Sequence, residues 1–235
     1  MKEGLRAAWR LLTFRSSREE LQSLGTPNHL IFGLFCTWLV GVGRYWDDPE
    51  ASLLQHLGVG SVLYVFALAA FLSLAARPLV AGPWSYRNVL AFVTLTSPPA
   101  ALYAIPVERW VGFDAARSMN ESFLLTVAAW RTALWIFFLG RAGGLGPFVR
   151  SVTALLPLSM AGAVLSILNL DRVVLNVMGG LRGPQTVNDY AYSTLLSLGF
   201  LSVLAFFPLL IVYLVLIGRR ANRRKADSVS PPSAS

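Results

Sequence analysis

Charged residues are scarce in this chain. They make up 14% of its 235 residues, whereas a soluble domain of ordinary composition carries roughly 25%. Hydrophobic residues reach 55% and gather in long runs, and no polar stretch is long enough to form a separate soluble domain. The composition therefore excludes one large soluble core and indicates an all-α, polytopic membrane protein.

Cysteine and the common catalytic motifs are also nearly absent. Cys36 is the single cysteine, which excludes an intramolecular disulfide and a metal site built from cysteines. The first 25 residues are basic but contain no unbroken apolar core, so no secretory signal peptide is predicted. Neither an HExxH motif nor a phosphate-binding loop is present. The sequence therefore favours a non-enzymatic protein without a metal or another cofactor.

The amino-terminal segment, residues 1–25, is predicted to lie on the membrane surface. Within residues 3–14, helical spacing places apolar side chains on one face and basic side chains beside it: Leu5, Ala8, Trp9 and Leu12, flanked by Lys2, Arg6 and Arg10. A helix of this kind lies in the headgroup layer of an anionic leaflet. Ser17 and Glu20 then have the spacing of a capping box, which predicts a second short turn. The alternative is an amphipathic tail that is merely solvated.

Residues 26–218 are predicted to form a domain of six transmembrane helices. Thr26 and Pro27 have the cap-and-proline pattern of a helix start. The six apolar segments are about 28–46, 52–76, 88–106, 121–141, 147–169 and 191–217. Each is long enough to cross a bilayer of about 30 Å. The remaining residues, 219–235, are a basic anchor followed by a low-complexity tail that we expect to be disordered.

The distribution of charge predicts that both termini are cytoplasmic. Basic residues on the predicted inner side are Lys2, Arg6, Arg10, Arg15, Arg18, Arg77, Arg87, Arg141, Arg150 and the cluster 219–225, against Arg44, Arg109, Arg117, Arg172 and Arg182 outside. Most acidic residues fall outside: Asp47, Asp48, Glu50, Glu108, Asp114, Glu121, Asp171 and Asp189. This asymmetry follows the positive-inside rule and accounts for the net charge of +8 without nucleic acid. The compact loops indicate a bacterial inner membrane, with an anionic inner leaflet as the partner surface and a membrane protein or a second copy as a further partner.

Arg131 is a charge near the middle of the segment 121–141. Because a central arginine costs roughly 2.5–3.5 kcal/mol on insertion scales, its side chain is expected to face the bundle. Trp135 follows one turn later, where its ring could stack on the guanidinium. Pro98 and Pro99 predict a kink or break in the segment 88–106, which frees backbone carbonyls. Arg131 is therefore either a contact for an anion or lipid headgroup, or a structural partner of those carbonyls or of an outer acid.

A second candidate site lies at the predicted outer ends of the helices. His56 follows Asp47 and Asp48 in the sequence, and Glu108 and Glu121 fall on the same side. Carboxylates beside a histidine could bind a divalent cation or serve acid–base catalysis. Topology alone also gathers acids outside, so a plain outer surface is the competing interpretation. His29, at the inner end of segment 28–46, is interpreted as an interface or capping residue.

The block VLAFVTLTSPPAALYAIP precedes a helix with a central tryptophan and arginine and then a glycine-rich turn. Over residues 85–145 this pattern resembles the Yip (Ypt-interacting protein) domain family. The resemblance implies a non-enzymatic membrane protein of membrane organisation or trafficking, with an amphipathic amino-terminal segment, a proline-bearing middle helix and typically five spans. It implies no catalytic residue.

Three functions are therefore open at the level of the sequence. The first is a non-enzymatic protein that organises the membrane or binds lipids or a partner protein. The second is a small-molecule or ion transporter with Arg131 in its pathway, because a broken helix and a central charge suit transport. The third is an intramembrane enzyme that uses His56 and the outer acids.

Overall fold

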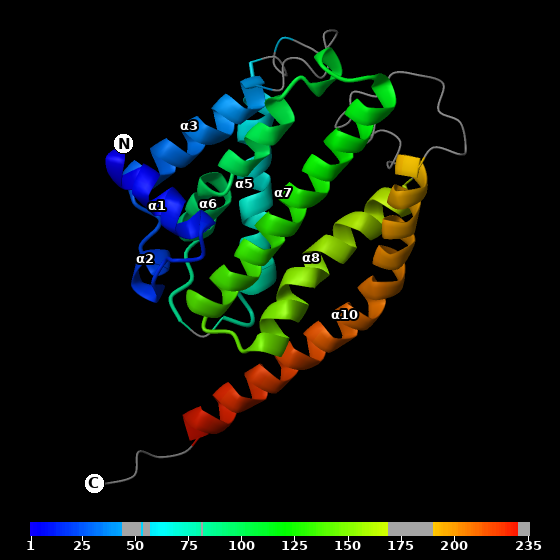
Figure 1. Ribbon diagram of the computed structural model, residues 1–235. Helices are drawn as coiled ribbons and strands as arrows, with labels where there is room; N and C mark the ends of the chain where they lie inside the picture. The colour runs from blue at the N-terminus through cyan, green and yellow to red at the C-terminus, as the bar shows by residue number, and fades with distance from the viewer. Residues whose placement is uncertain (44–52, 54–56, 81, 169–189, 230–235) are drawn as a thin grey trace.

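The computed structural model describes residues 1–43, 53, 57–80, 82–168 and 190–229, and every regular element in these ranges is helical (Figure 1). This confirms the predicted all-α class. The α-helices are α1 (Lys2–Leu12), α2 (Arg18–Gln22), α3 (Pro27–Gly43), α5 (Val59–Ala76), α6 (Tyr86–Leu95), α7 (Phe113–Arg141), α8 (Pro147–Ile167) and α10 (Tyr190–Val229). Two 3₁₀ helices, η2 (Pro98–Ala104) and η3 (Val107–Arg109), join α6 to α7.

Four of these helices are long and apolar enough to cross a membrane: α5, α7, α8 and α10. Helix α3 is apolar but has 17 residues, a length of about 25 Å against a hydrocarbon core of about 30 Å. The predicted segment 88–106 is divided between α6 and the 3₁₀ helices. The described structure therefore supports a multi-pass membrane protein by helix composition, with four continuous candidate spans instead of the six that the sequence predicts.

The break predicted at Pro98 and Pro99 is confirmed. Helix α6 ends at Leu95, and η2 begins at Pro98 after a turn through Thr96 and Ser97. Neither proline has a backbone N–H, and their rings clash with a continuing α-helix. The chain therefore tightens into 3₁₀ geometry, and α6 is a short helix whose residues from Val89 to Leu95 are all buried.

Small residues set the distances between neighbouring helices. Helices α3 and α6 meet at Gly33, where an added Cβ would lie 2.3 Å from Thr94 Oγ1. Gly41 on α3 likewise meets Ser61 on α5, since an added Cβ at Gly41 would lie 2.8 Å from Ser61 Oγ. Gly60 on α5, by contrast, has no atom within 4 Å of the position of an added Cβ. Close packing in this bundle is therefore local to particular glycines.

Helices α8 and α10 lie side by side along most of α8 (Figure 1). Their contact is reciprocal, because Gly162 on α8 faces Ser202 on α10, and Gly199 on α10 faces Ser166 on α8. Tyr213 further ties α10 to the end of α5, since its hydroxyl donates a hydrogen bond to the carbonyl of Ala75 at 2.6 Å. Helix α10 continues beyond the predicted limit near residue 217, through the basic run to Val229. Residues 230–235 of the predicted tail lie outside the described residues.

Candidate functional site

Arg131 faces the bundle, as expected for a charge in the middle of an apolar helix. Its Nη2 donates to the carbonyl of Val93 on α6 at 3.5 Å, and Leu134 on the same helix is fully buried. The α-helical donor to that carbonyl would be the N–H of Ser97, which instead bonds to Thr94 at 3.1 Å. Arg131 thus reaches a carbonyl that has no backbone N–H donor at the end of α6 and that it shares with the hydroxyl of Thr96. This geometry matches the structural interpretation, and the role of Arg131 as an anion contact stays a hypothesis.

The hydroxyl groups around this break are already hydrogen-bonded. Thr96 Oγ1 donates to the Val93 carbonyl at 3.0 Å, and Thr94 Oγ1 donates to the Leu90 carbonyl at 2.9 Å. Thr37 Oγ1 on α3 donates to the carbonyl of Gly33, one turn earlier in the same helix, at 2.9 Å. The same oxygen lies 2.8 Å from Ser97 Oγ. All of these hydroxyls are buried. The polar cluster beside Arg131 therefore satisfies itself and stabilises the contact between α3 and the end of α6.

Trp135 belongs to an aromatic cluster that fills the space between α6 and α7. Its ring centroid lies 5.4 Å from Phe92, 5.7 Å from Phe138 and 6.2 Å from Trp84. Only 5% of the residue is exposed, and its Nε1 has no hydrogen-bond partner in the part of the chain that the structure describes. Trp135 is thus a core residue here, and its predicted stacking on the guanidinium of Arg131 stays a prediction.

The predicted site at the outer ends of the helices lies mostly outside the described residues. This holds for Asp47, Asp48 and His56. Glu108 is in η3 with its side chain not described, and Glu121 is a half-buried residue of α7. Within the described residues, no group of three or more histidine, cysteine, aspartate and glutamate side chains is placed to hold a metal ion. Metal binding or catalysis by the outer acids therefore stays an untested hypothesis.

Helix α1 packs on the bundle through a face that periodicity alone did not identify. Gly4, Ala8 and Leu11 are buried, and an added Cβ at Gly4 would lie 2.6 Å from the Cβ of Phe32 on α3. The predicted apolar face is wrong in one respect: Ala8 is buried against the bundle and does not share the exposed side of the helix. Leu5 and Trp9 do lie on that side, at 62% and 64% exposed. The helix has a packed face and, beside it, an apolar stripe that no described element covers.

Helix α2 has a local cap, and the side chains of Asn88 and Gln22 fix it on the bundle. The predicted capping box is confirmed: Glu20 N donates to Ser17 Oγ at 3.2 Å, and Ser17 N donates to Glu20 Oε2 at 2.9 Å. Asn88 on α6 accepts from the N–H of Gly25 at 2.7 Å and donates to the carbonyl of Gln22. The side chain of Gln22 donates to the Ala142 carbonyl after α7 at 3.2 Å. Helices α1 and α2 therefore form one unit, the amino-terminal unit, held on the bundle.

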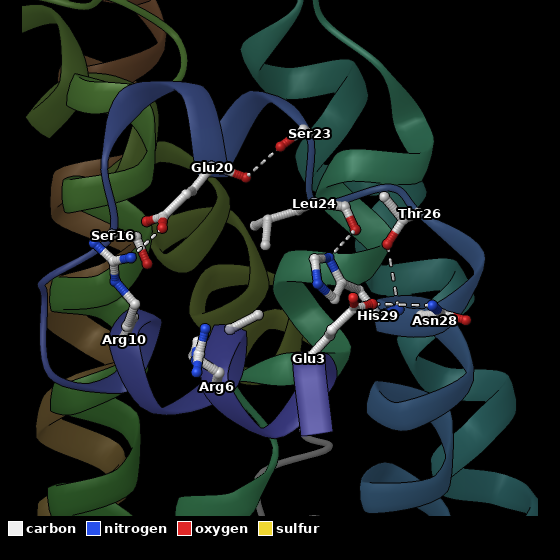
Figure 2. A pocket seen from close by; sticks show the side chains of 11 residues that line it. Glu3, Arg6, Arg10, Ser16, Glu20, Ser23, Leu24, Thr26, Asn28 and His29 are labelled. Atoms are coloured by element: carbon white, nitrogen blue, oxygen red, sulfur yellow. Dashed lines mark hydrogen bonds and ion pairs between the residues drawn. The ribbon is translucent and has the colours of Figure 1, made fainter. Parts of the chain in front are cut away.

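The amino-terminal unit encloses a charged pocket of about 330 Å³ with the start of α3 (Figure 2). Its lining residues are Glu3, Arg6, Ala7, Arg10, Ser16, Glu20, Ser23, Leu24, Thr26, Asn28 and His29. Arg10 pairs with Glu20, and Asn28 Nδ2 donates to Glu3 at 3.1 Å. His29 Nδ1 lies 3.2 Å from the Leu24 carbonyl. Figure 2 shows Arg6 on α1 between Glu3 and Arg10, and within the described residues Arg6 forms no ion pair.

The sequence does not predict this pocket. In the sequence, its charged residues belong to two separate features, the basic edge of α1 and the capping box of α2. The pairing of Arg10 with Glu20 spans 10 residues and requires α2 to fold back over α1, which no periodicity encodes. The capping box was the available signal, because it stops the chain from continuing as one long helix after α1.

Comparison with known proteins supplies no relative from which a function could be transferred. No protein-family model matches the chain, and neither a curated protein nor a solved structure shows significant similarity to it. The resemblance to the Yip domain family therefore rests on residues 85–145 alone.

Proposed function

We propose that the protein is a non-enzymatic, multi-pass membrane protein that binds and organises phospholipids at the cytoplasmic leaflet through its amino-terminal unit. The observation that carries this proposal is the arrangement of α1, which is packed on the bundle and yet exposes the apolar side chains of Leu5 and Trp9. Tryptophan and leucine beside basic residues are typical of helices that lie in the headgroup layer.

The pocket behind α1 supports binding of headgroups. Arg6 carries a positive charge without an ion-pair partner in the described part of the chain, and Glu3 lies near it in the same lining. A phospholipid headgroup presents a phosphate anion, and a zwitterionic headgroup adds an ammonium cation. The guanidinium of Arg6 suits the phosphate, and the carboxylate of Glu3 suits the cation. We infer that lipids lying along Leu5 and Trp9 place their headgroups at this pocket.

We further propose that α3 and the broken segment α6–η2 complete a bundle of six membrane-embedded segments with both termini inside. Helix α3 falls only a few residues short of a full span. Irregular backbone within a membrane is tolerated where protein surrounds it and satisfies its polar groups. The buried turn at Thr96 and Ser97, with its side-chain hydrogen bonds to carbonyls, meets that condition. The charge asymmetry between the loops supports the orientation.

Transport and catalysis have less support. A transport pathway needs a polar cavity at Arg131, but Arg131 does not line the pocket of Figure 2, and the neighbouring hydroxyls bond to the backbone and to one another. Catalysis by His56 and the outer acids involves residues of which three lie outside the described part. The resemblance to the Yip domain family, which implies membrane organisation, agrees with the lipid-binding proposal.

The Leu5→Ser/Trp9→Ser variant tests the lipid-binding proposal. Because both side chains are exposed in the bundle, we expect an unchanged thermal unfolding midpoint but about tenfold weaker retention of phospholipid during delipidation, counted by native mass spectrometry. Leu63→Ser, at a similarly exposed leucine of α5, is the matched control. Equal lipid retention by the wild type and the double variant would contradict the proposal. Deletion of residues 1–22 is a poorer test, because it would uncover buried core residues.

A further inference from the structure

We propose a second and separate lipid site, which binds the phosphate of an anionic phospholipid in the groove between the carboxy-terminal half of α10 and the turn that leads into α8. The groove has a volume of about 480 Å³. Its lining residues are Leu79, Gly144, Leu145, Gly146, Val149, Leu216, Arg219, Arg220 and Arg223. None of them belongs to the amino-terminal unit, so this site does not depend on the function proposed above.

The charge of the groove is of one sign. Arg219 and Arg223 are four residues apart on α10, and Arg220 lies beside them, so helical spacing gathers their side chains at one edge. No acidic residue is part of the lining. The planar guanidinium group donates two parallel hydrogen bonds to a phosphate, which makes arginine the usual residue for this ligand. Arg219 and Arg223 are exposed and therefore accessible to a headgroup.

The opposite wall is the start of α8, which adds a second source of positive potential. Gly146 is the N-cap of this helix of 21 residues, and Pro147 follows as its first residue. Pro147 has no N–H, and the N–H of Arg150 bonds to the Gly146 carbonyl. The donors here that lack intrahelical acceptors and favour anions are therefore the N–H groups of Phe148 and Val149. No atom lies within 4 Å of the position of an added Cβ at Gly146, so the backbone can be approached there. Gly144 has φ +66, a conformation that glycine adopts without strain and that turns the chain toward α8.

The remaining lining distinguishes a lipid phosphate from a free phosphate ion. Val149 and Leu216 are half-buried, and Leu79 and Leu145 are buried, so apolar side chains line the groove beside the arginines. A free ion would use only the polar part of this groove. A phospholipid would place its phosphate at the arginines and its first methylene groups on the leucines and the valine. The same lining supports an anionic headgroup over a zwitterionic one, because no carboxylate is present to receive an ammonium group.

The test is binding of dioctanoyl phosphatidylglycerol to the purified full chain in detergent, with dioctanoyl phosphatidylcholine and inorganic phosphate as comparison ligands. We expect Arg219→Gln/Arg223→Gln to weaken binding of the anionic lipid about tenfold or more, with an unchanged thermal midpoint because both residues are exposed. Lys2→Gln/Arg15→Gln removes the same charge from the amino-terminal unit, at two exposed positions, and should change binding less than twofold.

Three results would overturn the proposal. An equal loss in the amino-terminal control would mean that the lipid senses only overall charge. Binding of inorganic phosphate as tight as that of the lipid would exclude the apolar wall from recognition, and equal binding of phosphatidylcholine would exclude the selectivity for anionic headgroups. These comparisons are made in the Leu5→Ser/Trp9→Ser background, which removes the exposed apolar residues of the amino-terminal unit. The loss caused by Arg219→Gln/Arg223→Gln should persist there, so failure of the amino-terminal proposal and failure of this one are distinguishable.

Discussion

Gly33→Ala should lower the thermal unfolding midpoint of the purified protein in detergent, whereas Gly60→Ala should leave it unchanged or raise it. An added Cβ at Gly33 would lie 2.3 Å from Thr94 Oγ1 and 3.2 Å from the backbone nitrogen of Leu95. Thr94 cannot move aside cheaply, because it is fully buried and its hydroxyl bonds to the Leu90 carbonyl. We expect Gly33→Ala to lower the free energy of unfolding by about 1–3 kcal/mol, the usual cost of overpacking a tight contact.

Gly60 supplies the matched control for this prediction. It is also a helical glycine, but it is exposed, and nothing lies within 4 Å of the position of an added Cβ. Alanine there should raise the free energy of unfolding by up to about 1 kcal/mol, because it restricts the unfolded chain and favours the helix. Equal midpoints for Gly33→Ala and the wild type would contradict the close approach of α3 to α6 at Thr94.

Arg131→Leu should improve membrane insertion of the α7 segment by about 2.5–3.5 kcal/mol, measured as the inserted fraction of the isolated segment in microsomes. Arg141→Leu is the control, since it makes the same substitution at the last residue of the same helix. Near the membrane surface an arginine can reach water, so the control should change insertion far less. Equal gains at the two positions would contradict the placement of Arg131 at the middle of a transmembrane helix.

In the assembled protein the same substitution should act in the opposite direction. Arg131 donates to the Val93 carbonyl where α6 ends, and leucine removes that donor. Thr96 still bonds to the same carbonyl, so the expected loss of folding free energy is only about 0.5–1.5 kcal/mol. A lower thermal midpoint together with better insertion would identify Arg131 as a residue retained for assembly of the bundle. An unchanged midpoint would contradict its structural role.

Helix ends that depend on local chemistry were predictable from the sequence. The end of α7 agrees with the prediction at Arg141, where a glycine-rich turn follows. The break at Pro98 and the capping box at Ser17 also agree, because the missing N–H of proline and the hydroxyl of serine act within a few residues. The start of α7 at Phe113, eight residues before the predicted start at Glu121, was not predicted. Its first two turns carry two charged and two other polar residues, Asp114, Arg117, Ser118 and Asn120. Hydropathy marks the apolar segment, not the whole helix.

Contacts between distant segments were not predictable in the same way. The packed face of α1 depends on Gly4, which carries no hydropathy signal but lets Phe32 approach. Asn88 binds Gln22 and Gly25 from more than 60 residues away, and a single polar side chain has no periodic pattern. The amino-terminal pocket follows from these contacts. Periodicity therefore predicted that α1 is amphipathic, but not which of its sides is packed and which is exposed.

Single-cysteine labelling tests the six-segment topology most directly. In a Cys36→Ser background, Ser23→Cys, Gly82→Cys, Met119→Cys and Asn222→Cys would each be exposed to a membrane-impermeant maleimide in sealed, right-side-out vesicles. The six-segment bundle predicts that positions 23, 82 and 222 react only after permeabilisation and that position 119 reacts in intact vesicles. Labelling of Gly82→Cys from the side opposite to Ser23→Cys would mean that α3 does not cross the membrane, which would contradict the proposed topology.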